Sequence, residues 1–255
     1  MVILEIKDLT HNFRGLTALC RIDVQVQEGE IFGVIGPNGA GKTTLFNIIS
    51  GFLKPSYGNI LFQRKSIVGL RPDEIVRKGV VRSFQGTSLF PAFTCLENVI
   101  LAHHLYKEFG FWQTMFNTQF HRLREEEVIK KSQQVLEDLN LADKKEILAQ
   151  NIPYGHQKML GIAMALATNA RLLLLDEPVS GMTPSESVVV TGEIRKIRDE
   201  QGKTIVLVEH NMKTVMGVCD RIVVIDHGAK IAEGSPEFIK NNPQVIEAYL
   251  GMDEI

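Results

Sequence analysis

The sequence has few cysteines and no long apolar run. Its 255 residues include three cysteines, Cys20, Cys95 and Cys219, which lie far apart and form no Cys-x-x-Cys pair. This spacing argues against a disulfide framework or a zinc site and suits a reducing compartment, where we expect all three cysteines to be small buried residues. No stretch reaches the roughly 18 to 20 apolar residues of a membrane span, and the N-terminus resembles a strand rather than a signal peptide. We therefore expect a cytoplasmic chain, for which peripheral association with a membrane stays open.

The sequence also lacks an excess of charge of either sign. It has 28 Lys and Arg residues against 30 Asp and Glu, a formal net charge of −2, with 44% hydrophobic and 23% charged residues. That composition is typical of an ordinary globular protein. Because no basic surplus attracts a polyanion, we expect no nucleic-acid partner. The length suits one large α/β domain, or one domain that carries an insert.

Strand-like segments open and close the chain, and a helical segment lies between them. Apolar alternation predicts strands from Val2 to about Gly36, and apolar residues at helical spacing predict a helix over 42–50. We place a helical insert between 100 and 150. Beyond it we predict helices over 157–168 and 185–200 and strands over 172–175, 204–208 and 222–225. This alternation predicts a parallel sheet covered on both faces.

A glycine-rich loop joins a predicted strand to a predicted helix. Residues 36–43 read Gly-Pro-Asn-Gly-Ala-Gly-Lys-Thr and fit the phosphate-binding pattern Gly-x4-Gly-Lys-Ser/Thr. Its glycines let backbone N–H groups turn toward a phosphate, Lys42 can reach the outer phosphates, and the Thr43 hydroxyl can ligate Mg²⁺. Such a match rarely arises by chance, which disfavours a simple turn with a surface lysine. The predicted phosphate-binding residues are Gly36, Pro37, Asn38, Gly39, Ala40, Gly41, Lys42, Thr43 and Thr44.

Two carboxylates follow a run of four leucines. The apolar strand 172–175 delivers Asp176 and Glu177 to its C-terminal end, beside the expected position of the loop. Asp176 would hold Mg²⁺, directly or through water, and Glu177 could polarise an attacking water as a general base. Alone, such a pair is more often the solvated start of a helix, so the prediction depends on the loop.

Five further features complete the pattern. They are Phe13, Gln85 within Arg82-Ser83-Phe84-Gln85, the segment from Ile152 to Lys158, the segment from Ser180 to Thr183, and His210. Each has a simpler explanation when taken alone, since a phenylalanine is usually core and a single glutamine or histidine after a strand is usually structural. In this order around the loop and the acidic pair, they resemble the ABC ATPase family along almost the whole chain.

The resemblance implies an α/β fold of the P-loop NTPase type. It implies a mixed core sheet, an N-terminal antiparallel β subdomain and a helical subdomain in a single ABC ATPase domain, 1–255. Residues 1–90 would form the β subdomain and the start of the nucleotide-binding core. About 91–165 would form the helical subdomain, and about 166–255 the rest of the RecA-like core with the C-terminal helix.

The resemblance also implies site roles, with ATP and Mg²⁺ as the cofactors. Phe13 would stack on adenine, Thr43, Gln85 and Asp176 would manage Mg²⁺, and Glu177, His210 and Gln85 would serve catalysis. Tyr154, Gly155 and His156 would belong to the signature motif, which closes over ATP bound to a second subunit. Two residues depart from the family pattern. Pro153 stands where a serine is usual, so one hydroxyl contact is absent and hydrolysis is expected to be slower, and we assign no catalytic role to His156.

Details narrow the resemblance to the subgroup that serves branched-chain amino acid importers, the LivG type. The features are Arg82-Ser83-Phe84-Gln85, Glu209-His210-Asn211-Met212 and the C-terminal Glu247-Ala248-Tyr249-Leu250-Gly251. Related importers of urea or amides, and lipopolysaccharide exporters, share parts of this pattern. A soluble ABC ATPase that acts on DNA or ribosomes, and a regulatory module with little turnover, are further alternatives.

The resemblance implies membrane permease subunits as partners, a second ATPase subunit in a homodimer or heterodimer, and a solute-binding protein indirectly. The chain would be peripheral on the inner face of the cell membrane. An aromatic segment from Tyr106 to Phe120 fits two descriptions, a small helical core or a docking surface for the permease. The simpler description, a core, is the more frequent one.

Overall fold

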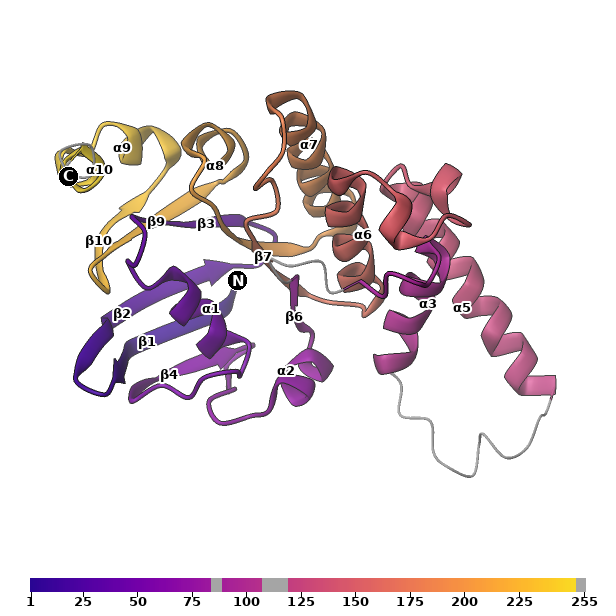
Figure 1. Ribbon diagram of the computed structural model, residues 1–255. Helices are drawn as coiled ribbons and strands as arrows, with labels where there is room; N and C mark the ends of the chain where they lie inside the picture. Colours follow the sequence, from indigo (N-terminus) through magenta and orange to yellow (C-terminus); the bar gives the residue numbers. More distant parts are fainter. Residues whose placement is uncertain (84–88, 107–118, 251–255) are drawn as a thin grey trace. The chain divides into compact units, whose positions relative to one another are not determined.

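The computed structural model describes residues 1–83, 89–106 and 119–250 (Figure 1). The chain divides into two compact units. The first is built from Met1–Arg82 together with Arg171–Ile255, and the second is Ser83–Ala170. The first unit is therefore made of two segments that are separated in the sequence by the whole of the second.

An antiparallel sheet forms part of the first unit, in the order β2-β1-β4-β5. Its strands are β1 (Val2–Phe13), β2 (Leu16–Gln27), β4 (Tyr57–Phe62) and β5 (Lys65–Ser66). Successive side chains of a strand point to opposite faces, and Ile22, Val24 and Val26 of β2 are accordingly buried while the residues between them are exposed. A register shift between Leu19 and Ile22, where Arg21 has a positive φ, lets Leu19 be buried as well. Cys20 follows Leu19 on the other face and is exposed. The prediction of three buried cysteines is therefore wrong for Cys20 and confirmed for Cys95 and Cys219.

A six-stranded sheet forms the centre of the first unit, in the order β10-β9-β3-β8-β7-β6. Its strands are β3 (Ile31–Ile35), β6 (Val80–Ser83), β7 (Leu172–Asp176), β8 (Thr204–Val208), β9 (Arg221–Asp226) and β10 (Ala229–Gly234). Strand β3 is parallel to both β8 and β9, and β7 is parallel to β8, whereas β9 and β10 form an antiparallel hairpin. The sheet is mixed, as the family resemblance implies; the parallel pairing predicted from the alternation holds for β3, β7, β8 and β9, and β10 departs from it. Every residue of β3, β7 and β8 is buried.

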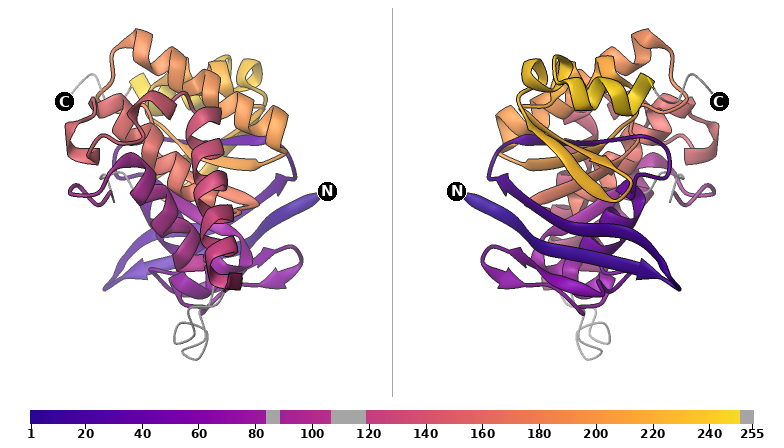
Figure 2. Two further views of the ribbon diagram at one scale, coloured as in Figure 1. Left: turned by 90° about the vertical axis from the view of Figure 1, so that its right-hand side faces the viewer. Right: turned by 90° about the vertical axis from the view of Figure 1, so that its left-hand side faces the viewer.

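Six helices accompany these sheets among the described residues of the first unit. They are α1 (Lys42–Ile49), α2 (Pro72–Lys78), α7 (Pro184–Gln201), α8 (Met212–Val218), α9 (Pro236–Lys240) and α10 (Pro243–Leu250). Helices α1 and α7 confirm the helices predicted over 42–50 and 185–200. Leu45 and Phe46 of α1 join one apolar core with the strands of both sheets. Helices α9 and α10 pack on the β9–β10 hairpin (Figure 2).

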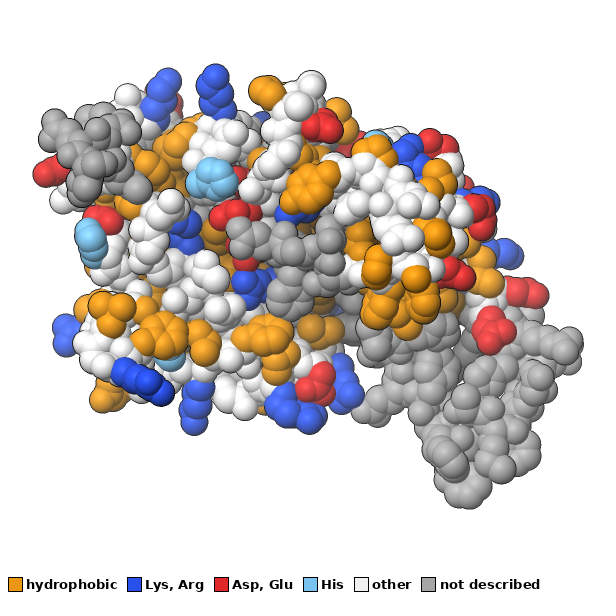
Figure 3. Space-filling model, in the orientation of Figure 1, with side chains coloured by type: hydrophobic (Ala, Val, Ile, Leu, Met, Phe, Trp, Pro, Cys, Tyr) orange, Lys and Arg blue, Asp and Glu red, His pale blue; other side chains and the backbone are white. Residues whose placement is uncertain are grey.

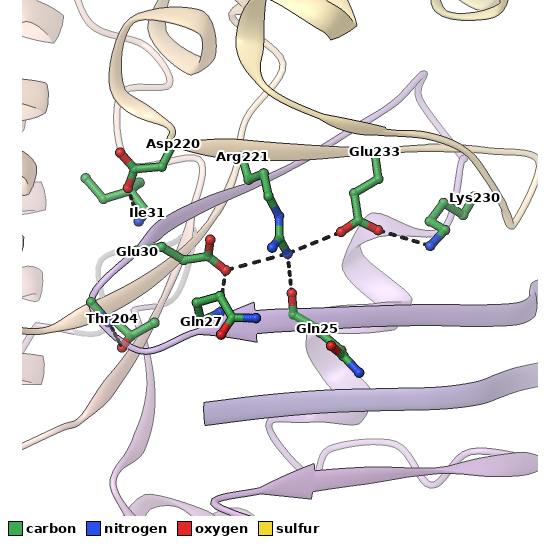
Figure 4. A network of polar contacts seen from close by, with 10 residues as sticks. Gln25, Gln27, Glu30, Ile31, Thr204, Asp220, Arg221, Lys230 and Glu233 are labelled. Atoms are coloured by element: carbon green, nitrogen blue, oxygen red, sulfur yellow. Dashed lines mark hydrogen bonds and ion pairs between the residues drawn. The ribbon is translucent and has the colours of Figure 1, made fainter. Parts of the chain in front are cut away.

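A polar network joins the two sheets of the first unit (Figure 4). The Arg221 guanidinium, at the start of β9, lies 3.2 Å from Glu233 Oε1 and 3.7 Å from Glu30 Oε1, and it donates to the Gln25 carbonyl of β2. Lys230 of β10 lies 3.0 Å from Glu233 and donates to the Asp23 carbonyl. Partial burial raises the pKa of Glu30 above its usual range, although a backbone hydrogen bond and the Arg221 charge oppose this. The network holds β2 beside β9 and β10.

The second unit contains the helical insert. Its described elements are α3 (Cys95–Tyr106), α5 (Gln119–Asp138), α6 (Tyr154–Ala167) and two short 3-10 turns, Ala142–Lys144 and Ala149–Asn151. The three helices pack on one another around buried residues such as Val99, Leu136 and Leu160. Of the aromatic segment, Phe109, Phe111, Trp112 and Phe116 lie outside the described residues, and only the helical backbone is described at Tyr106 and Phe120. None of the described helices of either unit combines the length and hydropathy needed to span a membrane.

Candidate functional site

The glycine-rich loop leaves the buried strand β3 and enters α1. Gly36 has φ 155°, and a Cβ there would lie 1.9 Å from the carbonyl oxygen of Ile225 in β9. Gly41, the N-cap residue of α1, has φ 106°, and a Cβ there would lie 2.6 Å from the carbonyl oxygen of Ala18 in β2. Only glycine fits at either position. The loop backbone is therefore confined between two strands and follows the narrow path that a phosphate cradle requires.

Lys42 is buried and folds back over this loop. Its Nζ donates to the Gly36 carbonyl at 2.6 Å and to the Pro37 carbonyl at 2.8 Å. Burial lowers the pKa of the Lys42 ammonium from its usual value, while the negative charges of Glu177 and Asp176 oppose the shift. The ammonium therefore lies within the loop and in the field of both carboxylates. Thr43 is exposed and Thr44 half-buried on the first turn of α1.

The acidic pair stands at the C-terminal end of β7. Asp176 pairs with Val208 in the parallel register between β7 and β8, and it is 3% exposed. Glu177 has the left-handed φ of 48°, uncommon for a residue other than glycine, and its N–H donates to the Val208 carbonyl at 2.9 Å. Strained backbone of this kind is frequent at functional sites.

His210 follows the neighbouring strand and faces Glu177. Its Nδ1 lies 3.8 Å from Glu177 Oε1, and the His210 side chain is 57% exposed. Strands β3, β8 and β7 are parallel neighbours, so the residues that follow them meet at one edge of the sheet. The structure thus brings Lys42, Asp176, Glu177 and His210 together in the first unit.

Arg82 is part of this site, although the sequence drew attention to it only as the start of the Gln85 segment. Its Nη2 lies 2.6 Å from Asp176 Oδ2, and its Nη1 donates to Asn47 Oδ1 of α1 at 2.7 Å. The Arg82 side chain is 7% exposed, and its guanidinium lies over the Phe46 ring. A carboxylate as buried as Asp176 needs a counter-charge. The sequence offers one indication of this role, which is an arginine within the short apolar strand β6.

Phe13 closes the strand β1 at the turn into β2. It is 43% exposed, so it is not a core residue, and its ring meets the His11 ring edge-on with centroids 4.5 Å apart. Apolar side chains reach the surface over the region of β1, β2 and α1 (Figure 3). Among the exposed large apolar side chains are Phe13 and Leu16 at the turn between β1 and β2, Phe52 after α1 and Tyr57 at the start of β4.

A cavity of about 870 Å³ lies against the glycine-rich loop, within the size range of small-molecule sites. Residues 37–40 form one wall, and Asp226 and His227 of the β9–β10 turn, with Gln244 and Glu247 of α10, form others. Neither Lys42 nor Asp176 belongs to its walls. The cavity therefore adjoins the loop on a side away from the carboxylates.

Comparison with known proteins agrees with this geometry. The profile of the family described as "ABC transporter" matches residues 19–180, and a second profile, "Branched-chain amino acid ATP-binding cassette transporter", matches residues 229–253. This chain belongs to the ABC transporter ATP-binding family. Members of this family bind ATP and couple its hydrolysis to transport through membrane permease subunits.

Individual relatives of this ABC ATPase cover nearly all of it. The high-affinity branched-chain amino acid transport ATP-binding protein BraF of Pseudomonas aeruginosa is 43% identical over 98% of both chains. The corresponding protein LivG of Escherichia coli is 40% identical over 98% of both chains. Among solved structures, the ADP conformation of the ATP-binding cassette MJ1267 has a TM-score of 0.87 at 30% identity, covering 98% of this chain and 99% of that one.

The residues predicted for the signature motif lie in the second unit, whereas the glycine-rich loop and the two carboxylates lie in the first. Tyr154, Gly155 and His156 form the first turn of α6, which begins three residues earlier than the predicted helix over 157–168. Pro153 is the N-cap residue and supplies no side-chain cap. Tyr154 is exposed, with the Lys158 ammonium 5.5 Å from its ring centre. Gln85 lies outside the described residues.

The residues of the first unit suit a magnesium ion that is shared with phosphates. Mg²⁺ takes oxygen ligands, and in such sites it is held by one or two protein side chains together with phosphate oxygens and water. Asp176 supplies a carboxylate and Thr43 a hydroxyl, one beside the loop and one on its helix. In the part of the chain that the structure describes, no three His, Cys, Asp or Glu side chains cluster into a protein-only metal site. The donor set fits the shared arrangement.

Proposed function

We propose that this chain is the Mg²⁺-dependent ATPase subunit of an importer for branched-chain amino acids. One observation carries the proposal: Lys42 lies within the phosphate loop beside a buried aspartate and a glutamate that faces a histidine. The relatives named for branched-chain amino acid transport, and the C-terminal profile over 229–253, support the choice of solute. That C-terminal match favours this solute over the urea, amide and lipopolysaccharide alternatives.

In this proposal the first unit binds ATP and performs the hydrolysis. The backbone from Gly36 to Thr44 holds the phosphates and Phe13 stacks on the adenine. Glu177 takes a proton from the attacking water, and His210 holds that water and the γ-phosphate. The 3.8 Å between His210 Nδ1 and Glu177 Oε1 places the two groups close enough to contact the same water molecule beside them.

Asp176, Thr43 and Gln85 would hold Mg²⁺, which neutralises charge on the phosphates when it is bound. Asp176 is fixed for this by Arg82 and by the ladder between β7 and β8. Lys42, which is held by the Gly36 and Pro37 carbonyls in the field of both carboxylates, adds a positive charge where the phosphates would lie.

The second unit would act as the helical subdomain, about 91–165, and complete a partner's site. Tyr154, Gly155 and His156 at the N-terminus of α6 would meet ATP held by a second ATPase subunit, identical or a sister protein. The pair would dock on membrane permease subunits at the cytoplasmic face of the cell membrane and act on a solute-binding protein only indirectly.

Steady-state phosphate release tests the enzymatic part of the proposal. Purified protein is titrated with Mg-ATP at several protein concentrations, together with Glu177→Gln. We expect turnover per subunit to rise with protein concentration, because two subunits share each site. Glu177→Gln should lose turnover by on the order of 100-fold or more and form an ATP-trapped dimer.

The matched control is Glu200→Gln, which changes an exposed glutamate near the C-terminal end of α7 and should keep full turnover. Turnover that is independent of protein concentration and insensitive to Glu177→Gln would contradict the paired site and its base. Uptake of labelled leucine by cells that lack their own branched-chain importer, supplied with this chain and its permeases, tests the solute. Uptake of urea or an amide in place of leucine would refute that part alone.

A further inference from the structure

Glu209 is a buried carboxylate that the site described above does not use. It follows β8, directly before His210, and its exposed fraction is 0%. A charged side chain is almost never this buried unless its charge is satisfied, because removing it from water costs several kcal/mol. The hydrogen bonds of the Glu209 carboxylate therefore indicate its role in the structure.

The two carboxylate oxygens of Glu209 hold two different segments. Oε1 accepts the Val179 N–H at 3.0 Å, in the turn that follows Glu177. Oε2 accepts the His210 N–H at 3.2 Å and the Asn211 N–H at 3.4 Å, at the start of α8. One side chain thus bridges the backbone after β7 and the backbone after β8.

These two segments carry the groups that face each other in the site. The turn beginning at Glu177 is closed by hydrogen bonds from the Ser180 N–H to the Glu177 carbonyl and from the Met182 N–H to the Val179 carbonyl. The sheet itself adds one further link, from the Glu177 N–H to the Val208 carbonyl. Beyond that link the strands end, and Glu209 ties the Val179 turn to the His210 backbone there.

Only a carboxylate fits this position well. Three N–H donors approach from two sides, and an ionised carboxylate is an acceptor at both oxygens, whereas a glutamine would turn its NH₂ group toward one set of N–H groups. Hydrogen bonds to a charged acceptor are also stronger than those to a neutral one. Burial raises the pKa of Glu209, and the three backbone hydrogen bonds and His210 oppose this shift.

We propose that Glu209 is a positioning residue for ATP hydrolysis, which holds the Val179 turn and the His210 backbone together and so sets the position of His210 relative to Glu177. This inference rests on the proposed function of Glu177 and His210. It assigns no contact between Glu209 and ATP, so nucleotide binding at the phosphate loop is independent of it.

Amide hydrogen exchange of the nucleotide-free protein tests the tether without any ATPase assay. In Glu209→Gln we expect either the Val179 amide or the amides of His210 and Asn211 to lose protection, depending on which side the NH₂ group faces, while the amides of β3 and α1 keep theirs. Glu200→Gln is the control and should leave Val179 unchanged. Unchanged protection of all three amides in Glu209→Gln would overturn the proposal, whether or not the protein hydrolyses ATP.

Kinetics then separate positioning from general damage. Glu209→Gln should lower kcat by on the order of 100-fold, the loss that a misplacement of about 1 Å can cause, with KM for ATP and the affinity for a fluorescent ATP analogue changed less than about twofold. Glu209→Asp, which keeps the charge, should regain part of kcat. A kcat equal to that of the parent, or a loss of ATP affinity as large as the loss of kcat, would refute positioning.

A double variant shows whether Glu209 acts through His210. If it does, Glu209→Gln adds nothing to His210→Ala, and the double variant has the kcat of His210→Ala alone. A further loss by the full factor seen in Glu209→Gln alone would contradict the proposal. Absence of turnover in the parent would count against the proposed function, and hydrogen exchange would still decide whether the tether exists.

Discussion

The pair of Arg82 and Asp176 shows what a buried charge requires at the scale of single residues. Both side chains are nearly removed from solvent, and Asn47 accepts a further hydrogen bond from the guanidinium. Such pairs contribute little net stability, because desolvation offsets their attraction, yet losing one partner leaves the other charge buried and uncompensated. The main contribution of Arg82 to stability is therefore that it compensates the buried charge of Asp176.

Arg82→Met should destabilise the protein by about 3 to 5 kcal/mol, since it leaves the Asp176 carboxylate buried without a counter-charge. Chemical denaturation monitored by circular dichroism measures this. The double variant Arg82→Met/Asp176→Asn should recover most of the loss, because the uncompensated charge is then absent.

The matched control for this change is Arg77→Met. Arg77 pairs at 3.9 Å with Asp73 in an exposed position, and exposed pairs contribute about 0 to 1 kcal/mol. Equal losses of unfolding free energy in Arg77→Met and Arg82→Met would show that burial does not decide the energetics here.

At the scale of elements, α7 begins at a well-formed cap. The Thr183 hydroxyl accepts the Glu186 N–H at 3.4 Å, and the Glu186 carboxylate accepts the Thr183 N–H at 2.9 Å. Pro184 at the first helical position completes the start. The cap fixes the boundary between the turn after Asp176 and the first residue of α7.

Thr183→Ala should cost about 0.5 to 2 kcal/mol of unfolding free energy, the usual effect of losing an N-cap side chain. Thr183→Ser keeps the hydroxyl and should lose much less. Thermal and denaturant unfolding of the parent and the two variants measures these differences. An alanine variant as stable as the serine variant would show that the Thr183 hydroxyl does not stabilise the start of α7.

Local elements could be predicted from the sequence, and contacts between distant segments could not. The strand over 204–208 and the loop between β3 and α1 follow from apolar runs and glycine spacing within about ten residues. The sequence predicts too late a start for α6, because Pro153 and Gly155 are typical of a loop, whereas Pro153 takes the N-cap position. The bond between Arg82 and Asp176 joins residues 94 positions apart, and the fold alone brings them together.

At the scale of the whole molecule, the three thiols differ in access. Cys20 is exposed, Cys95 is buried in the second unit and Cys219 is buried in the first. Burial raises the pKa of the Cys95 thiol, and it raises that of Cys219 to about 12. Since the thiolate is the reactive form, the two buried cysteines should be inert in the native protein.

Titration with a thiol reagent at about pH 8 should therefore modify one cysteine rapidly in the native protein and all three after denaturation. Cys20→Ser should remove the fast reaction and leave the slow ones. Rapid modification of two or three thiols in the native protein would contradict the burial of Cys95 or Cys219.

The interrupted first unit has a consequence for the nascent chain. Strand β3, at 31–35, lies between β8 and β9, at 204–208 and 221–226, so the ribosome makes the central strand long before either neighbour. At usual rates of synthesis this delay is on the order of ten seconds or more. During that time the four apolar side chains of β3 and its unpaired backbone remain without their partner strands while the second unit is completed. Aggregation on the ribosome, and protection by chaperones that bind apolar strands, should therefore concentrate on the first 35 residues.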